Sequence, residues 1–396
     1  MNALERKSTF ALSTILTLRM LGLFMALPLF SLYALRMNNA SPQLAGIALG
    51  IYGLTQAFFQ IPLGTCSDYF GRKKVITFGL LLFISGSILV ATSNSIQFAI
   101  IGRALQGAGA IGSTVIALMS DLIRDDQRSK AMAFAGMMIG TSFSVALVIG
   151  PALTPWIGFN GIFWLAAIFG IIAIFVLYRT VPDPDFIPTP ANKYFLSNLK
   201  NALFYTSLPH LYFGIFILHV LFTATFMTLP IDLKNQLGFS ENRQWIIYLS
   251  ALIPGFLISI FFIVSAEKKQ RMKIVFRAAI LLIGLAEFCF SYFSAHLFLI
   301  IFALFLFFTG FSTLEAILPS LVSRLAPPTH KGSALGIYSC AQFSGIFVGG
   351  LAGGWLMGSY NTAAVYLASL FLGIVWIIIT FSMKNSQNHR AFSSSN

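Results

Sequence analysis

Charged residues are scarce in this sequence. Only 9% of its 396 residues are Asp, Glu, Lys or Arg, whereas 57% are hydrophobic. Soluble domains carry about 25% charged residues, and a core of ordinary size cannot bury so much apolar surface. The shortage of charge therefore excludes a soluble globular protein and indicates that lipid is the solvent for most of the chain.

Cysteine is also scarce, and several chemical signatures are missing. Cys66, Cys289 and Cys340 lie in or at the ends of apolar stretches without paired spacing, which argues against disulfides and cysteine metal sites. The sequence contains no phosphate-binding P-loop that would use ATP. Its five histidines are scattered and form no nucleophile, base or metal cluster with the few acids of the apolar stretches. We therefore expect neither enzymatic activity nor a cofactor, and the proton gradient is the expected source of energy.

Long apolar segments dominate what is present. A membrane-spanning helix needs about 20 apolar residues, and the alternation of a β-barrel strand is absent, so helices must satisfy the backbone in lipid. The first segment is too long for a signal peptide and is interpreted as an uncleaved span. The sequence thus predicts an all-α integral membrane protein with twelve transmembrane helices. The predicted spans are 10–35, 43–66, 74–93, 96–121, 130–156, 160–181, 209–233, 243–266, 273–293, 296–323, 332–358 and 361–383.

The basic residues indicate the orientation. Most of the 25 Lys and Arg residues fall at the N-terminus and in every second connection, and the opposite connections hold only Arg36, Lys234 and Arg243. The positive-inside rule then places both termini in the cytoplasm and the protein in the inner (plasma) membrane. The net charge of +13 reflects this topology, so no nucleic-acid partner is expected.

The longest interruption of the apolar pattern lies between spans six and seven. Four prolines open it, and from Lys193 onward Phe195, Leu196 and Leu199 recur at helical spacing. This pattern predicts a short amphipathic helix on the inner membrane surface, with an ordinary linker as the alternative. The predicted organisation is an N-terminal six-helix bundle (1–181), a cytoplasmic linker (182–208), a C-terminal six-helix bundle (209–383) and a short cytoplasmic tail (384–396).

The two halves repeat each other. The segment SAEKKQRMK (265–273) matches CSDYFGRKK (66–74), so that Glu267 falls on Asp68 and Arg271 on Arg72. Further on, SRLAPPTHKGSAL (323–335) matches SDLIRDDQRSKAM (120–132) in the same order. Parallel six-helix repeats with a binding site between the halves at mid-membrane are a secondary-transporter architecture.

The loop after the second span carries a recognisable motif. The motif is G-x-x-x-D-x-x-G-R-K, formed by Gly64, Asp68, Gly71, Arg72 and Lys73. At this place in the chain it resembles the loop motif of the major facilitator superfamily. Together with the twelve predicted spans in two halves, the resemblance covers essentially the whole chain. The resemblance implies that superfamily's fold, two pseudo-symmetric six-helix bundles that work by alternating access.

Two further matches resemble the drug:proton antiporter branch. Arg103, Gln106 and Gly107 match its R-x-x-Q-G motif, and Gly150-Pro151 matches its helix-5 motif in part. The first five spans are most similar to YajR-type members, although the added C-terminal soluble domain of those members is not expected here. The resemblance implies proton-coupled export of an amphipathic or lipophilic small molecule, and transport of a specific metabolite or sugar is the alternative. The expected partners are a small-molecule substrate, protons and the lipid bilayer, and a monomer is expected.

The loop motif implies a conformational latch. By the resemblance, Arg72 pairs with Asp121 while Asp68 faces the start of helix 11 and favours the outward-open state, with glycines permitting close approach. Such a contact is weak, but it can bias conformers that differ by a few kcal/mol. The alternative is a plain positive-inside loop. The latch residues are Gly64, Asp68, Gly71, Arg72, Lys73 and Asp121, with Glu267 and Arg271 as the repeat in the second half.

Two arginines lie inside predicted spans. A charge at such depth normally faces a protein interior or a watery cavity. Arg103 belongs to the helix-4 motif, which implies a role in proton coupling or internal pairing, with a structural hydrogen-bonding anchor as the alternative. Arg19 is a central-cavity candidate, and snorkelling toward the cytoplasm is its alternative.

The proton carrier is sought among the titratable groups of the spans. Glu315 is the first candidate because helix 10 lines the cavity of this fold, and a carboxyl group in an apolar cavity can exchange protons near neutral pH. His219 is a second candidate, Asp232 has a gating or a solvated-end role, and Glu287 is interpreted as structural. Phe58, Phe59 and Phe226 are candidates for contact with an apolar ligand.

Overall fold

The computed structural model describes residues 1–183, 201–205, 208–268, 271–327 and 331–382, except for the side chain of Glu267. Within these residues the chain is helical apart from turns and one isolated bridge between Asn38 and Ser95. The helices are α1 (Ala3–Phe24), α2 (Leu27–Ala34), α3 (Pro42–Phe70), α4 (Arg72–Thr92), α5 (Ile96–Ala108), α6 (Gly112–Leu122), α7 (Asp125–Thr180), α9 (Leu208–Asn235), α10 (Gln244–Lys268), α11 (Met272–Tyr292), α12 (Leu297–Leu325), α13 (Lys331–Ser359) and α14 (Thr362–Phe381), with a 3₁₀ turn, η1, at Glu241–Arg243.

The described helices provide twelve membrane spans. Eleven helical segments are long and apolar enough to cross a membrane, where α1 with α2 and α5 with α6 each count as one segment. The 56-residue helix α7 holds two spans that meet at Gly158, whose φ of 70° breaks the helical backbone. Glycine adopts this left-handed conformation without steric cost. The predicted gap between spans five and six falls at this residue.

The break between α1 and α2 is packed against α7. A Cβ atom at Gly150 would lie 1.8 Å from the carbonyl oxygen of Met25, so only glycine permits this approach. Gly150 therefore lets α7 pack closely against the break between α1 and α2.

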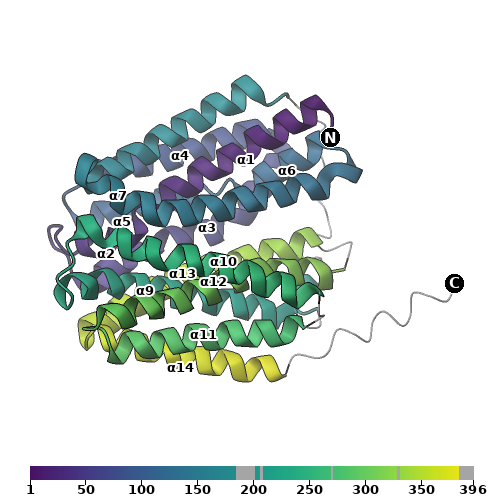
Figure 1. Ribbon diagram of the computed structural model, residues 1–396. Helices are drawn as coiled ribbons and strands as arrows, with labels where there is room; N and C mark the ends of the chain where they lie inside the picture. Colours follow the sequence, from purple (N-terminus) through teal and green to yellow (C-terminus); the bar gives the residue numbers. More distant parts are fainter. Residues whose placement is uncertain (184–200, 206–207, 269–270, 328–330, 383–396) are drawn as a thin grey trace.

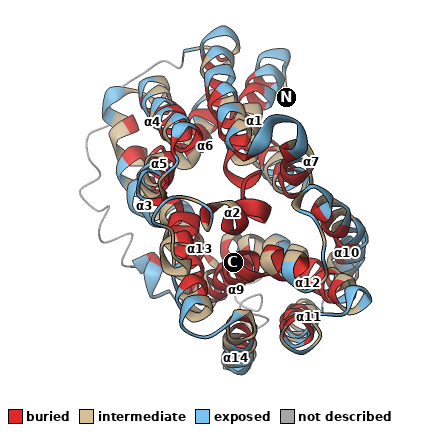
Figure 2. Cartoon of the chain, turned by 90° about the vertical axis from the view of Figure 1, so that its left-hand side faces the viewer, coloured by how far each residue is buried: buried red, intermediate tan, exposed pale blue. Residues whose placement is uncertain are grey.

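The helices form two bundles, one above the other in Figure 1. The upper bundle contains α1 to α7 and the lower one α9 to α14, and α1 begins at the same end of the molecule at which α14 ends. Figure 2 looks along the helices and shows exposed residues mainly on the outer faces. We call the end that carries Lys73, Arg128 and Lys331 the basic end, and the other the opposite end.

The bundles touch each other mainly along α3 and α13, from the opposite end to Ala57, whose carbonyl oxygen accepts a hydrogen bond from Cys340 Sγ at 3.3 Å. A Cβ atom at Gly46 would lie 2.2 Å from the carbonyl oxygen of Gly350, and one at Gly354 would lie 2.5 Å from that of Pro42. Toward the basic end, Gly336 of α13 has open space around its Cβ direction, and so does Gly136 of α7. The bundles are thus sealed at the opposite end and diverge at the basic end.

Most of the linker prediction lies outside the described residues. The segment 201–203 is helical, and the carbonyl of Ala202 accepts a hydrogen bond from the Tyr212 hydroxyl at 3.2 Å. The remainder of the predicted amphipathic helix, from Lys193 to 200, and the tail 384–396 are not described.

Candidate functional site

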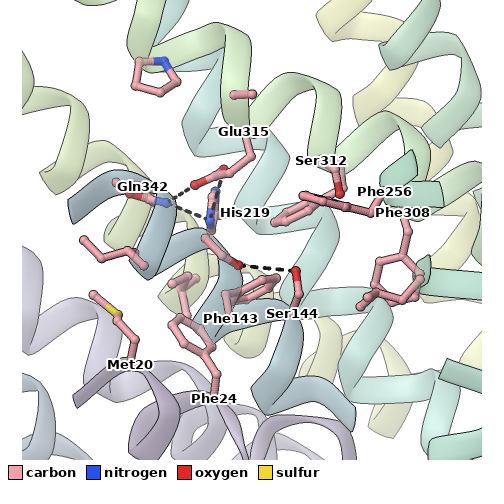
Figure 3. Close-up of a pocket in the computed structure, with 18 of the residues that line it drawn as sticks. Met20, Phe24, Phe143, Ser144, His219, Phe256, Phe308, Ser312, Glu315 and Gln342 are labelled. Atoms are coloured by element: carbon pink, nitrogen blue, oxygen red, sulfur yellow. Dashed lines mark hydrogen bonds and ion pairs between the residues drawn. The ribbon is translucent and has the colours of Figure 1, made fainter. Parts of the chain in front are cut away.

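A cavity of about 390 Å³ lies between the two bundles. It is bounded by α1 and α7 of the first bundle and by α9, α10, α12 and α13 of the second, and the labelled side chains of Figure 3 converge on it. Six of its twenty lining residues are polar, namely Ser144, His219, Ser312, Glu315, Tyr338 and Gln342. Its α7 and α13 walls continue into the region where the bundles diverge, so the cavity opens toward the basic end.

Aromatic rings form much of the cavity wall. Phe24 meets Phe143 edge to face at 4.8 Å, and Phe143 stacks on Phe311 at 5.7 Å, which carries aromatic contact from one bundle to the other. The three predicted ligand-contacting phenylalanines are not among the lining residues. Phe58 and Phe59 are exposed on the outer surface of α3, and Phe226 is fully buried inside the C-terminal bundle. Sequence spacing did not show which face of each helix turns to the cavity.

Gln342 joins the two titratable groups of the cavity. Its amide nitrogen donates to Glu315 Oε1 at 2.9 Å and lies 3.0 Å from His219 Nε2 (Figure 3). His219 Nδ1 lies 3.2 Å from the carbonyl oxygen of Ile215. Since a carbonyl only accepts, Nδ1 carries the proton, and Nε2 accepts from the amide. His219 is thus held in one neutral tautomer.

The carboxyl and the imidazole differ in access. The Glu315 side chain is 37% exposed, whereas that of His219 is 6% exposed, and His219 Nε2 lies 3.9 Å from Glu315 Oε2. The hydroxyl of Tyr338 lines the same wall and has no hydrogen-bond partner among the described residues. This arrangement can exchange a proton with water in the cavity at Glu315 and change the hydrogen bonds behind it.

Both buried arginines lie inside the N-terminal bundle, apart from the cavity wall. Arg103 donates to Gln106 at 2.8 Å and stacks over Tyr52 at 4.2 Å, and Arg19 donates to Gln56 at 3.0 Å. The described residues give neither guanidinium a carboxylate partner. Snorkelling of Arg19 is wrong, because its side chain is only 1% exposed. Arg103 anchors a side-chain network in this conformation rather than backbone carbonyls.

Asp232 and Glu287 lie in the C-terminal bundle, nearer the opposite end. Asp232 is 3% exposed and accepts hydrogen bonds from Tyr366 and Thr362, each at 2.9 Å. The prediction that Asp232 lies at a solvated end of the seventh span (α9) is therefore wrong. Glu287 is fully buried and accepts from Thr225 at 2.6 Å.

The loop after α3 contains the predicted ion pair. Arg72 pairs with Asp121 at 3.0 Å, as the resemblance implied. It also pairs with Asp68 and donates to Ser67. The contact of Asp68 with the start of helix 11 (α13) was expected for the outward-open state, and it stays a prediction: the described residues give Asp68 no partner on α13 in this conformation, and residues 328–330 before α13 are not described. The bundles diverge at the basic end, so Asp68 pairs with Arg72 of the same loop.

The remaining motif residues hold the loop in place. Gly71 has a φ of 93°, and a Cβ at Gly64 would lie 3.2 Å from Ser113 Oγ of α6. Lys73 donates to the carbonyl oxygen of Val181 at 2.7 Å, which ties the loop to the end of α7. In the second half, Arg271 is exposed before α11, and the side chain of Glu267 lies outside the described residues.

Sequence reasoning missed two features. Gln342 is a polar residue in a predicted span, a signal that could have marked it beside Glu315. The pairing of Arg36 with Glu241 across the bundles joins residues 205 positions apart, which no local pattern reveals. Within the described ranges, no three His, Cys, Asp or Glu residues stand close enough to hold a metal ion.

The chain resembles known membrane proteins over nearly its full length. The profile of the Major Facilitator Superfamily matches residues 12–349 and 211–395. The chain is 41% identical to the inner membrane transport protein YajR of Escherichia coli (strain K12), over 96% of this chain and 84% of that protein. It is 23% identical to the quinolone resistance protein NorA of Staphylococcus aureus (strain COL), over 97% and 98% of the two chains. A solved structure of a D-xylose-proton symporter superposes with a TM-score of 0.77 at 16% identity, covering 95% of this chain and 98% of that one.

Proposed function

The chain belongs to the major facilitator superfamily, and on this basis we propose that it is a proton-coupled secondary transporter that exports an amphipathic or lipophilic small molecule by alternating access. Membership of a transporter family and the absence of catalytic signatures in the sequence speak against an enzyme. The observation that carries the proposal is the placement of Glu315 on the wall of an otherwise largely apolar cavity between the bundles.

The cavity wall supports an amphipathic substrate. Fourteen of its twenty lining residues are apolar or glycine, and six of these are phenylalanines. Aromatic faces and edges attract apolar and cationic groups without demanding one ligand shape. The relative NorA is named for quinolone resistance, which fits a compound of this kind.

A specific metabolite or sugar is the second candidate. A sugar site needs paired polar groups around many hydroxyls, and this cavity offers six polar side chains, of which Gln342, His219 and Glu315 already bond to one another. The likeness to the D-xylose-proton symporter concerns the fold alone. The lining therefore favours the amphipathic substrate.

Glu315 is the proposed proton carrier. Its side chain is the accessible carboxyl of the cavity, and it shares Gln342 with His219. If the basic end faces the cytoplasm, the cavity is inward-facing in this conformation, and a proton taken up outside is released here while the substrate binds. Each positive charge that moves inward gains about 2.3 kcal/mol per 100 mV, which can drive export.

Glu315→Gln tests this function. We expect energised inside-out vesicles that contain the wild-type protein to lose their proton gradient on addition of ethidium or another amphipathic cation from a substrate panel, as reported by a pH-sensitive dye. Glu315→Gln should lower this dissipation by about tenfold or more, since it removes the group that carries the proton. Asp126→Asn, a change of an exposed acid at the start of α7, is the matched control. Equal dissipation by wild type and Glu315→Gln would contradict the proposed role.

A further inference from the structure

A second cluster of oxygen-bearing side chains lies inside the C-terminal bundle, apart from the cavity. Asp232 of α9 accepts hydrogen bonds from Tyr366 and Thr362 of α14, each at 2.9 Å, and from Gln236 at 3.3 Å. The ring of Tyr366 packs 5.4 Å from that of Phe290, which lies one turn after Glu287 in α11. The cluster therefore joins α9, α11 and α14 in the half of the bundle nearer the opposite end.

Glu287 is the carboxyl of this region with the fewest hydrogen bonds. Its side chain is fully buried, Oε1 accepts from Thr225 at 2.6 Å, and Oε2 has no hydrogen-bond partner among the described residues. The buried titratable side chains of the helices that pack around it include Asp232 of α9, Cys289 of α11 and Tyr366 of α14. The nearest cation on α9, Lys234, donates to Glu241 at 2.7 Å. Arg277 of α11 lies ten residues away, about 15 Å along the helix.

These surroundings differ for the two carboxyl groups. A charge on Glu287 is strongly disfavoured, because one hydroxyl group cannot replace the water that burial removes. Its neutral, protonated form is therefore the stable one in this conformation. Asp232 is also buried, but it receives three hydrogen bonds, which can stabilise a charge on its carboxyl, and it lies within one turn of the end of α9. Unlike surroundings of this kind separate the proton affinities of two acids.

We propose that Glu287 is a second proton-binding site, reached from the opposite end through the Asp232 cluster, and this role rests on the proposed proton coupling. The site is separate from the cavity, because Thr225, the partner of Glu287, lies six residues from His219 on α9, about 9 Å along the axis. The chemical step is the binding of one proton by the Glu287 carboxylate, which gives the carboxylic acid and changes no other covalent bond.

Infrared difference spectroscopy of the full chain in liposomes tests the site without a substrate. Protonated carboxyl groups absorb apart from carboxylates and shift in D₂O. We expect a protonated-carboxyl band that disappears as the pH is raised and is missing in Glu287→Gln. Thr225→Val should keep the carboxyl and shift the band, which preserves the test if the glutamine variant folds poorly. Asp232→Asn should slow the hydrogen–deuterium exchange of the band by about tenfold or more, since it removes the outer entry, whereas Ser291→Ala, at an exposed hydroxyl of α11, should not.

Three results would overturn the site. One is a band that Glu287→Gln leaves in place. Another is a band that never titrates or exchanges, which would make Glu287 a permanently neutral structural acid. The third is loss of the band on addition of NaCl, but not choline chloride, at constant pH, because the cluster would then bind sodium. The band does not depend on Glu315, so it should persist in Glu315→Gln, and failure of the proposed export function would be seen separately in the vesicle assay.

Discussion

Gln342 is the side chain through which the cavity carboxyl is linked to the buried imidazole. One amide nitrogen serves both Glu315 and His219, at 2.9 and 3.0 Å, and no other described side chain bonds to both groups. When Glu315 gains or loses a proton, its hydrogen bond with the Gln342 amide changes. The hydrogen bond of the same amide with His219 of α9 then changes as well. The amide is thus placed to report the state of the cavity to the interior of the bundle.

Gln342→Leu should weaken this link with little change in side-chain volume. We expect dissipation of the proton gradient by ethidium in inside-out vesicles to fall by about tenfold or more, because the residue changed positions both titratable groups. Ser312→Ala, at another polar residue of the same wall, is the control and should retain dissipation close to wild type. Wild-type dissipation in Gln342→Leu, at equal protein abundance, would show that the link has no part in coupling.

The sequence shows which residue types belong to the site, but it does not show which side chains they contact. Glu315 could be placed on the cavity because the family resemblance implies that the tenth span lines it, and an acid in a span normally faces a protein interior or a watery cavity. The phenylalanines could not be sorted, since forty-one of them occur and most are compatible with lipid, packing or a ligand. Phe143 and Phe311 are selected by the rotation of α7 and α12, which tertiary packing determines.

At the scale of the elements, the closest approach of a glycine to a neighbouring backbone joins α7 to the break between α1 and α2. The Cβ direction of Gly150 ends 1.8 Å from the carbonyl oxygen of Met25, whereas Gly136 of the same helix has nothing within 4 Å. Gly150→Val should therefore force α7 away and destabilise the protein by about 1–3 kcal/mol or more. Gly136→Val is a matched control with the same loss of backbone freedom.

Thermal unfolding of the detergent-solubilised variants measures this difference. We expect a clear decrease of the midpoint for Gly150→Val and a small change for Gly136→Val. Equal midpoints would mean that the helices can separate at Gly150 without cost, and the close approach would then have no structural role.

The number and order of the spans could be predicted because lipid imposes one hydrogen-bonding solution on each apolar segment. The interruptions could not be predicted in the same way. The break after Phe24 coincides with the packing of Gly150 against Met25, a contact between residues 125 positions apart. Spans five and six form one continuous helix, α7, with a single break at Gly158. The sequence showed this place only as a short gap between two apolar segments.

The turn from α3 to α4 carries a prediction about the closed state of the basic end. When the bundles meet there, Asp68 would approach the start of α13, where the helix N-terminus favours a negative charge by about 0.3–1 kcal/mol. Asp68→Asn should lower ethidium-driven proton movement by about two- to fivefold without lowering membrane insertion. Asp126→Asn is the control, and unchanged transport in Asp68→Asn would refute the latch.

On the scale of the whole molecule, the two halves have placed opposite chemistry in related bundles. Within the membrane spans, the N-terminal bundle buries Arg19 and Arg103, while the C-terminal bundle buries Asp232 and Glu287 and presents Glu315 to the cavity. The buried acid of the N-terminal bundle, Glu5, lies at the start of α1 and pairs with Arg124. The halves share a fold and a loop motif but not their buried charges. The proton machinery can therefore be confined to one half while the other supplies the opposing wall and the latch.

The opposite end is closed by an ion cluster and by the close contact of α3 with α13 at Gly46, Gly350 and Gly354, which we call the glycine seam. Arg36 of the first bundle pairs with Glu241 of the second, and Lys234 donates to the same carboxylate at 2.7 Å. The Glu241 side chain is only 12% exposed, so solvent screens the cluster less than an ordinary surface pair. Arg36 thus joins the two bundles at the opposite end, and Lys234 supports the shared carboxylate from the same bundle as Glu241.

Glu241→Gln should release this closure and shift the population toward the state with the basic end closed. An exposed pair contributes about 0.2–1 kcal/mol, which corresponds to a shift of up to about fivefold. Spin labels at Tyr69→Cys of α3 and Leu335→Cys of α13, in a chain without Cys66, Cys289 and Cys340, report the separation of the bundles. We expect the shorter of two distance populations to grow in Glu241→Gln.

A charge swap separates the ion pair from other effects of the substitution. Arg36→Glu combined with Glu241→Arg restores the pairing between bundles and should return the distances toward wild type, whereas either change alone places like charges together and should favour the shorter distance more strongly. Asp125→Asn, which removes a pair with Arg128 inside one bundle, should leave the distances unchanged. If the single and double variants give the same distances, the glycine seam alone closes the outer end, and the two mouths are not under the control of opposing charge contacts.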